Sequence, residues 1–207
     1  MSHRNLQNLG LLAAAALSTG CAAYKIDPPA GFAVVSENDW ETRMKAQDNV
    51  GLRLRRFENV KGGTLQFWAA DMVKKLGLRG YTLTSQSPVK SKNGKVGTRF
   101  DFDYETFDTE IPKFFTAVLF VTDTQKIVVQ VAGDRGLAGT YRARIPEILG
   151  ELKVRGCKAG SKICGGPQPP PLSTQTPPRP ADAKPNPEPA AAAVTPAAVT
   201  PAEPPKP

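Results

Sequence analysis

Three acidic side chains share one face of a predicted strand. Asp101, Asp103 and Glu105, here called the acidic row, alternate with aromatic residues between positions 96 and 107, so successive Cα atoms on that face would lie about 6.6–6.8 Å apart. Carboxylates at this spacing could bind a metal ion or perform acid–base chemistry. A flat strand supplies poorly the roughly six to eight oxygens that calcium requires, however, and nothing suggests a sugar cleft for a glycosidase-like pair. We therefore favour a solvated sheet face, neutralised by Arg99 and by lysines on neighbouring strands.

The only histidine of the chain is His3, and it lies in a segment that reads as an export signal. This segment combines one cation, Arg4, with an apolar run over positions 9–17, which predicts that residues 1–20 are removed. The run is too short for a transmembrane helix, which needs about 20 apolar residues. A mature chain without histidine excludes Ser-His-Asp and Cys-His catalysis and histidine-ligated zinc or iron. We therefore expect a non-catalytic protein without a cofactor.

A cysteine stands a few residues beyond the apolar run. The sequence Leu17-Ser18-Thr19-Gly20-Cys21 resembles the lipobox of bacterial lipoproteins. In that family the cysteine thiol receives a diacylglycerol, the peptide is cut just before it, and the new amine is usually acylated too. The resemblance implies that Cys21 carries the lipid anchor, with palmitate-type acyl chains, and is the first residue of the mature protein. The alternative is a plain secretory signal that leaves Cys21 as a free thiol.

The residue after this cysteine indicates a location. Ala22 stands where aspartate, in many Gram-negative lipoproteins, causes retention at the inner membrane, so the resemblance favours the outer membrane, facing the periplasm. The chain has 27 Lys and Arg against 19 Asp and Glu, a net charge of +8. Outside the cytoplasm we expect no nucleic-acid partner, and this charge favours anionic lipid headgroups, lipopolysaccharide or acidic wall polymers.

The two remaining cysteines, Cys157 and Cys164, bracket a short segment in which Gly160 and Ser161 favour a tight reversal. An even pair of cysteines in an oxidising compartment indicates a disulfide. Two cysteines alone make a poor metal site, and their spacing is not that of a zinc knuckle. We predict a structural disulfide between them rather than a redox role.

The composition changes abruptly after Gly166. Residues 167–207 hold 15 of the 20 prolines and no aromatic residue. Such a segment buries too little apolar surface to offset its ordering entropy, so we predict a disordered, polyproline-like tail rich in proline and alanine. The expected organisation is a signal peptide at 1–20, a tether at 21–30, one domain at 31–166 and the tail at 167–207.

Apolar residues alternate in six segments of the domain and recur at helical spacing in two. The predicted strands cover about 32–36, 50–58, 81–88, 96–107, 113–122 and 126–132, and the predicted helices follow Thr64 and residues 133–136. Phe57 breaks the alternation of its strand, which predicts a β-bulge near Arg55-Arg56. Asn93-Gly94 predicts a hairpin.

The last helix contains Pro146, which is tolerated only in a first turn. We expect this helix to begin near residues 142–145, or to be kinked at Pro146 if it begins at Leu137. The segment 133–136 before it lacks the lysine and hydroxyl residue of a phosphate loop and is interpreted as the entry to the helix. Together these elements predict an α+β fold, with an antiparallel sheet of about six strands packed by two main helices.

This order of elements resembles the PsbP-like fold and its DcrB-like domains. The resemblance covers residues 31–153 and rests on element order, on the Gly31-Phe32 start, on Trp40 before the second strand and on the closing amphipathic helix. Members of the fold mostly serve as binding or assembly subunits, which implies a binding or assembly module with an envelope-protein or cell-wall partner. Two alternatives remain: a structural lipoprotein that links membrane to cell wall through its tail, and an enzyme that uses the acidic row.

Overall fold

The computed structural model of the chain describes residues 22–104 and 112–174. In chain order the strands of this part are β1 (Tyr24–Ile26), β2 (Phe32–Glu37), β3 (Glu41–Ala46), β4 (Gly51–Glu58), β5 (Thr82–Lys90), β6 (Val96–Tyr104), β7 (Lys113–Val121), β8 (Gln125–Asp134) and β9 (Leu152–Val154). The helices are α1 (Leu65–Gly77), α2 (Ala138–Ala143) and α3 (Ile145–Gly150), and the 3-10 turns are η1 (Val60–Gly62) and η2 (Arg135–Leu137). None of the helices in the described ranges is long and apolar enough to cross a bilayer. The chain divides into two units after Thr176, and every described residue belongs to the first.

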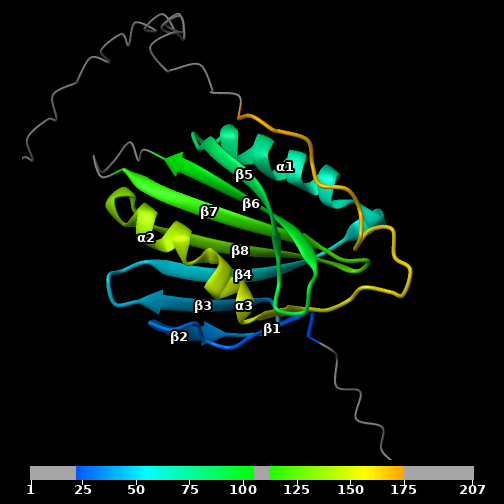
Figure 1. Ribbon diagram of the computed structural model, residues 1–207, viewed down its shortest axis with the longest axis horizontal. Helices are drawn as coiled ribbons and strands as arrows, with labels where there is room; N and C mark the ends of the chain where they lie inside the picture. Colours follow the sequence, from blue (N-terminus) through cyan, green and yellow to red (C-terminus); the bar gives the residue numbers. More distant parts are fainter. Residues whose placement is uncertain (1–21, 105–111, 175–207) are drawn as a thin grey trace, which may run out of the picture. The chain divides into compact units, whose positions relative to one another are not determined.

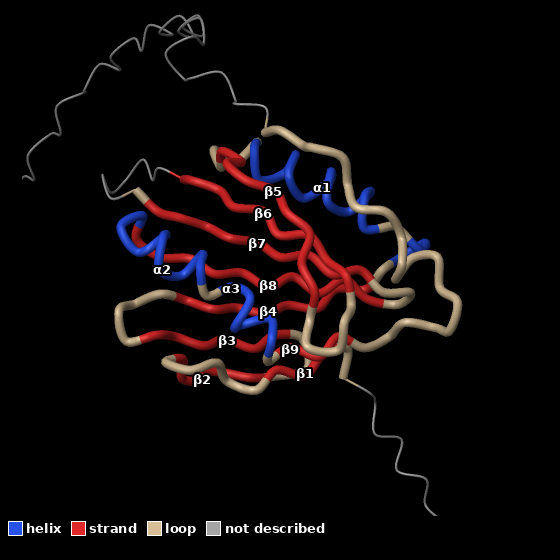
Figure 2. The backbone as a smooth tube through the Cα atoms, viewed as in Figure 1, coloured by secondary structure: helices blue, strands red, loops and turns tan. Residues whose placement is uncertain are grey.

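Seven of the described strands form one antiparallel sheet in the order β2-β3-β4-β8-β7-β6-β5. The first three strands are a meander, α1 then carries the chain to the opposite edge, and β5 to β8 return until β8 pairs with β4 (Figures 1 and 2). β1 and β9 form a separate antiparallel pair. The expected α+β class with an antiparallel sheet is therefore confirmed, with one strand more in the main sheet than the six expected.

Alternation along β7 divides the core between the two faces of the sheet. Val118 and Phe120 belong to a cluster that includes residues of α2 and α3, whereas Leu119 and Val121 belong to a cluster that includes residues of α1. Figure 1 shows α2 and α3 crossing the sheet and α1 alongside β5 and β6. Helices therefore cover both faces of the sheet, and each face buries its own set of apolar residues.

The first helix begins where its sequence predicts. Thr64 caps α1, because its side-chain oxygen accepts a hydrogen bond from the Phe67 amide at 3.2 Å. Leu65, Ala69 and Val73 recur at helical spacing and are buried, so they fix the face of α1 that packs on the sheet.

The closing helix is interrupted at Arg144, between α2 and α3. Pro146 lies in the first turn of α3, where an amide donor is not needed. Helical structure begins at Ala138, earlier than the start expected near residues 142–145, and the break expected for an early start is present just before the proline, at Arg144. The predicted hairpin is also present, since Gly94 has φ 74° in the connection between β5 and β6.

Strand β3 was not predicted from the sequence. Thr42, Met44 and Ala46 of this strand are buried, while Arg43 and Lys45 between them are exposed. The buried side chains are small or unbranched, so the alternation is weak in the sequence although it is clear in the structure.

The predicted bulge near Arg55-Arg56 is wrong. β4 pairs with β8 in unbroken register from Gly51 to Glu58, and Phe57 is simply exposed on the outer face. The register shifts occur instead in the two edge strands, between Val34 and Ser36 of β2 and between Leu83 and Ser85 of β5. Bulges at sheet edges discourage pairing with other chains.

Both ends of the described chain pack on the domain. Tyr24 lies in the segment expected as a tether, yet it is buried within β1. At the other end, the Gln86 side-chain amide donates to the carbonyl oxygens of Pro169 and Pro170 at 3.0 Å and accepts from the Leu172 amide at 3.1 Å. Residues 167–174, expected to belong to the tail, therefore lie along β5, and disorder of residues 175–207 stays a prediction outside the described chain.

Candidate functional site

The first residue of the acidic row does not lie on a solvated face. Asp101 is 6% exposed, and its carboxylate accepts hydrogen bonds from the Thr116 hydroxyl at 2.6 Å and from the Arg99 guanidinium at 3.0 Å. The expected neutralisation by Arg99 is confirmed, but expected exposure is wrong for Asp101, because α2 covers this part of the face. Glu105 lies outside the described residues.

An arginine of α2 contacts the acidic side chains of β6. One Arg142 nitrogen lies 3.0 Å from an Asp103 oxygen, and another lies 3.6 Å from an Asp101 oxygen. Arg142 also donates to the Phe102 carbonyl oxygen at 2.9 Å. These contacts join the helix to the strand, so they fasten α2 to β6. Within residues 22–104 and 112–174, no three His, Cys, Asp or Glu side chains are grouped so that they could hold a metal ion.

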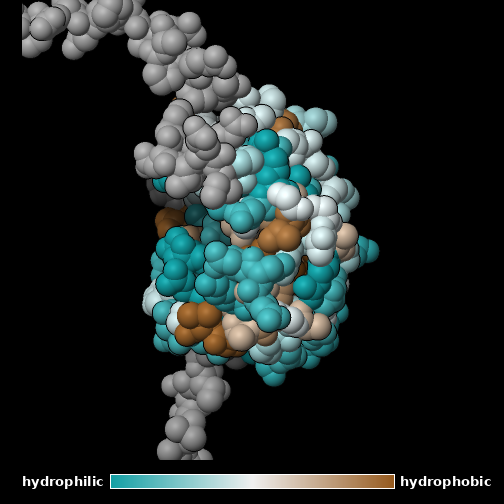
Figure 3. All heavy atoms as spheres, turned by 90° about the vertical axis from the view of Figure 1, so that its left-hand side faces the viewer, coloured by the Kyte–Doolittle hydropathy of each residue, from teal (hydrophilic) through white to brown (hydrophobic). Residues whose placement is uncertain are grey.

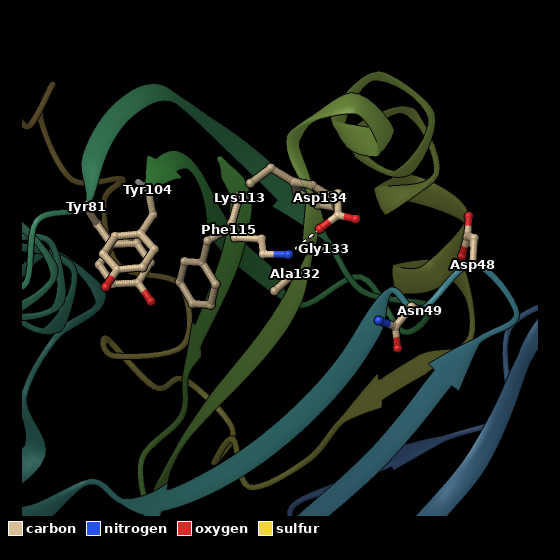
Figure 4. Close-up of a pocket in the computed structure, with 10 residues that line it drawn as sticks. Asp48, Asn49, Tyr81, Tyr104, Lys113, Phe115, Ala132, Gly133 and Asp134 are labelled. Carbon is tan, nitrogen blue, oxygen red and sulfur yellow. Dashed lines mark hydrogen bonds and ion pairs between the residues drawn. The ribbon is translucent and has the colours of Figure 1, made fainter. Parts of the chain in front are cut away.

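An open hollow lies at the end of the sheet where β6 and β8 end and β7 begins. Its volume is about 310 Å³. Phe114 and the residues labelled in Figure 4 line the hollow: Asp48, Asn49, Tyr81, Tyr104, Lys113, Phe115, Ala132, Gly133 and Asp134. Figure 3 views this end of the molecule, where hydrophilic residues predominate and hydrophobic ones form small separate patches.

Aromatic rings form one side of this hollow. The rings of Tyr81 and Tyr104 are stacked with their centroids 4.4 Å apart, and the Phe115 ring meets Tyr81 edge-on at 5.2 Å. Burial raises the pKa of the Tyr81 hydroxyl, and the nearby Tyr104 raises it further. The Tyr81 hydroxyl is thus neutral at physiological pH, and the stacked rings offer an apolar surface with hydroxyl groups for hydrogen bonding.

Charged groups form the other side. The Lys113 ammonium pairs with the Asp134 carboxylate across neighbouring strands, as the dashed line in Figure 4 marks. Gly133 keeps the hollow's floor close to the core, because a Cβ there would come within 2.7 Å of a Val50 methyl carbon. The hollow therefore combines an aromatic wall with a cation and an anion, which suits binding of a polar or aromatic group.

The turn between β3 and β4 closes the hollow's far rim. Asn49 has φ 71°, a left-handed conformation that asparagine tolerates better than most residues. Asp48 accepts a hydrogen bond of 2.6 Å from the Tyr141 hydroxyl of α2. Burial, and then this hydrogen bond to a carboxylate, raise the pKa of Tyr141. The rim is thereby tied to the helical layer.

The predicted disulfide joins Cys157 and Cys164, whose Cα atoms are 5.9 Å apart. Asp123, in the turn between β7 and β8, accepts hydrogen bonds of 2.8 Å from the Lys158 amide and from the Ser161 hydroxyl. The Lys158 amide, followed by the Ser161 hydroxyl, lowers the pKa of Asp123. The disulfide loop is therefore fastened to the sheet, and this supports the structural role predicted for it.

Sequence reasoning did not select the aromatic hollow. Tyr81 and Tyr104 were assigned only to strands, and Asp134 only to the entry of the last helix. A signal was present, because Tyr81 directly precedes β5 and Tyr104 ends β6, its antiparallel partner. Antiparallel pairing brings the start of one strand beside the end of the next, so two tyrosines in these positions must meet.

No protein-family model matches the chain, and no curated protein matches it. Among solved structures, the chain is similar to a protein of Bacteroides thetaiotaomicron VPI-5482, with 10% identity and a TM-score of 0.39, over 67% of this chain and 47% of that one. The chain thus spans less than half the length of that protein. It is also similar to the solution structure of cyanobacterial PsbP (CyanoP) from Synechocystis sp. PCC 6803, with 11% identity and a TM-score of 0.42, over 67% of this chain and 96% of that one.

The second of these structures has the fold that the order of elements resembles. At such identities and scores neither similarity carries an argument, and the antiparallel α+β fold rests on the strand order of this chain.

Proposed function

We propose that the chain is a non-catalytic lipoprotein of the bacterial cell envelope whose domain binds or positions another envelope component. In this proposal Cys21 bears the acyl chains and becomes the first residue of the mature protein, and the outer membrane, facing the periplasm, is the expected location. The partner is a protein or a cell-wall polymer.

The observation that carries the proposal is the separation of the two ends of the sheet. Ala22, which follows Cys21, lies near the β2–β3 turn, since it lines a hollow there with residues 37–39. The aromatic hollow lies at the opposite end, beside the β3–β4 turn. β8 runs between these ends, and its ten residues span roughly 30 Å. A protein anchored at Cys21 would therefore hold the aromatic hollow well away from the bilayer, where a partner can reach it.

Crosslinking in intact cells tests this proposal. A benzophenone amino acid replaces Gln47, an exposed residue of the β3–β4 turn, or in a control Asp39 of the β2–β3 turn. We expect a discrete crosslinked partner from position 47, and loss of that product when Lys113→Ala removes the cation of the hollow. A matched control, Lys153→Ala on the exposed side of β9, should leave the product unchanged. A persistently solitary protein at position 47 would count decisively against a binding module.

The structural-lipoprotein alternative, in which the proline-rich tail links membrane to wall, receives support from one observation. The Leu83 amide donates to the Thr174 side chain at 3.1 Å, so the described chain ends beside the start of β5, at the same end as the aromatic hollow. A tail leaving from there would start on the side away from Cys21. Deleting residues 175–207 without altering association with the cell wall would remove this alternative. The weaker alternative of a carboxylate enzyme finds little support, because Asp101 and Asp103 are paired with arginines.

A further inference from the structure

Exposed large apolar side chains gather at one end of the domain. Trp40, Phe57, Val60 and Phe67 are 54%, 36%, 59% and 59% exposed. They belong to the β2–β3 turn, the end of β4, η1 and the first turn of α1, all of which lie where β4 ends, on the right in Figure 1. Leu78, at the other end of α1, is 65% exposed. Apart from Leu78 and two valines of the edge strand β2, the described residues expose no other large apolar side chain.

Cationic groups lie over the aromatic rings at this same end. The Arg56 guanidinium carbon lies 4.4 Å from the centre of the Trp40 ring, and that of Arg55 lies 4.8 Å from the centre of the Phe57 ring. Aromatic side chains paired with long cationic ones are characteristic of the water–bilayer boundary, where rings occupy the headgroup layer and cations reach lipid phosphates.

The described chain begins at this end too. Ala22 and Ala23 line a hollow of about 470 Å³ with Asn38, Asp39 and Arg56. Two of these residues lie close to Trp40: Asp39 precedes it in the sequence, and the Arg56 amide donates to the Trp40 carbonyl oxygen at 3.0 Å. One peptide bond joins Cys21 to Ala22, which places their Cα atoms about 3.8 Å apart. Since Tyr24 is already buried in β1, no free linker separates the domain from Cys21.

We infer that this end of the domain is a membrane-contact surface, in which Trp40 and Phe57 enter the headgroup layer and Arg55 and Arg56 contact lipid phosphates. The inference rests on the proposed function, because it takes Cys21 as the lipid anchor, and it adds the orientation of the domain and the residues that touch the bilayer. Exposed carboxylates at the same end, of Glu37, Asp39 and Glu58, partly offset the arginines. The surface therefore suits headgroups of mixed charge, such as phosphatidylethanolamine with some phosphatidylglycerol.

The test uses the full lipidated chain, purified from membranes and reconstituted into vesicles of phosphatidylethanolamine and phosphatidylglycerol that contain a brominated phospholipid. Bromine quenches tryptophan fluorescence only at short range, and the chain has two tryptophans. Three forms are compared: the wild type, Trp40→Phe, and Trp40→Phe combined with Leu78→Trp. All substitutions are at exposed positions, so folding is preserved, and Trp68 is present in every form.

Because Trp40→Phe removes the tryptophan placed in the headgroup layer, we expect this variant to show lipid quenching lower than that of the wild type by about half or more. Adding Leu78→Trp should not restore the quenching. Equal quenching in wild type and Trp40→Phe, or restoration by Leu78→Trp, with all forms still floating with the vesicles, would overturn the membrane-contact surface and leave the lipid anchor intact. A native protein without acyl mass at Cys21 that fails to float would overturn both.

Discussion

The hydroxyl oxygens of Tyr24 and Thr42 lie 3.0 Å apart in a buried hydrogen bond that joins β1 to β3. Tyr24 is thereby fixed to the main sheet only three residues after Cys21. Burial is the main cause that raises the pKa of Tyr24, so the hydroxyl stays protonated and can serve as a hydrogen-bond donor. This contact, together with the pairing of β1 with β9, holds the segment expected as a tether on the domain.

Tyr24→Phe should lower the free energy of unfolding by about 1 kcal/mol, because it leaves the buried Thr42 hydroxyl without its partner. Lys25→Ala, on the exposed side of the same strand, should change stability by no more than about 0.5 kcal/mol. Urea denaturation of the two variants measures the difference. Equal stability of Tyr24→Phe and wild type would mean that β1 is not held through this bond.

Arg142→Met should destabilise the protein by about 2 kcal/mol or more, because it removes a cation from a network that includes the buried Asp101. Methionine keeps most of the apolar length of the side chain, so the loss reports on charge and hydrogen bonding. The control is Lys75→Met, which breaks an exposed pair with Asp71 on α1 and should cost no more than about 0.5 kcal/mol. Similar losses from both substitutions in thermal unfolding would refute a special role for the Arg142 network.

Asp123 should make the disulfide loop sensitive to acid. Its pKa is lowered from an ordinary value of 3.8 by the Lys158 amide and the Ser161 hydroxyl. A lowered folded-state pKa means that the stabilisation is complete above the ordinary value and is lost as the pH falls through the lower folded value. Urea denaturation measures the free energy of unfolding of the wild type and of Asp123→Asn across this acidic range, and the two free energies should converge as the pH falls. A difference between them that stays constant down to the lowest pH would contradict the assignment.

Gly133→Ala should destabilise the protein by about 1–3 kcal/mol through overpacking, because the new methyl group would meet Val50 and Phe114. Gly139→Ala is the matched control, since it lies in α2 with nothing within 4 Å of the added carbon. That control should stabilise the protein by about 0.5–1 kcal/mol, because alanine is the better helix former. Differential scanning calorimetry measures the unfolding temperatures of the two variants, and we expect a decrease for Gly133→Ala and an increase for Gly139→Ala.

Local sequence patterns identified the elements whose signals are strong. Thr64 with the buried stripe of α1, Asn93-Gly94 and Pro146 each state a local conformational requirement, and the structure meets all three. β1 and β9 are three residues long, which is too short to display a period, and their burial comes from pairing across about 130 positions. Such elements exist because of tertiary packing, so no local pattern could indicate them.

The burial of Asp101 in the acidic row depends on a residue far away in the sequence. Asp101 alternates correctly with the phenylalanines of β6, and from that pattern it reads as a solvated carboxylate. The packing of α2 places Arg142 near Asp101, and Thr116 and Arg99 donate hydrogen bonds to the same carboxylate, so Asp101 is a buried, paired group. The aromatic hollow was missed for a similar reason, since Tyr81 and Tyr104 are brought together by strand pairing.

The most direct test of the whole account is intact-mass spectrometry of the native protein purified from membranes, with sequencing of its first residues. We expect a chain that begins at Cys21 and carries the added mass of a diacylglycerol, and usually of a third acyl chain. A chain that begins elsewhere, or that begins at Cys21 without any acyl mass, would contradict it.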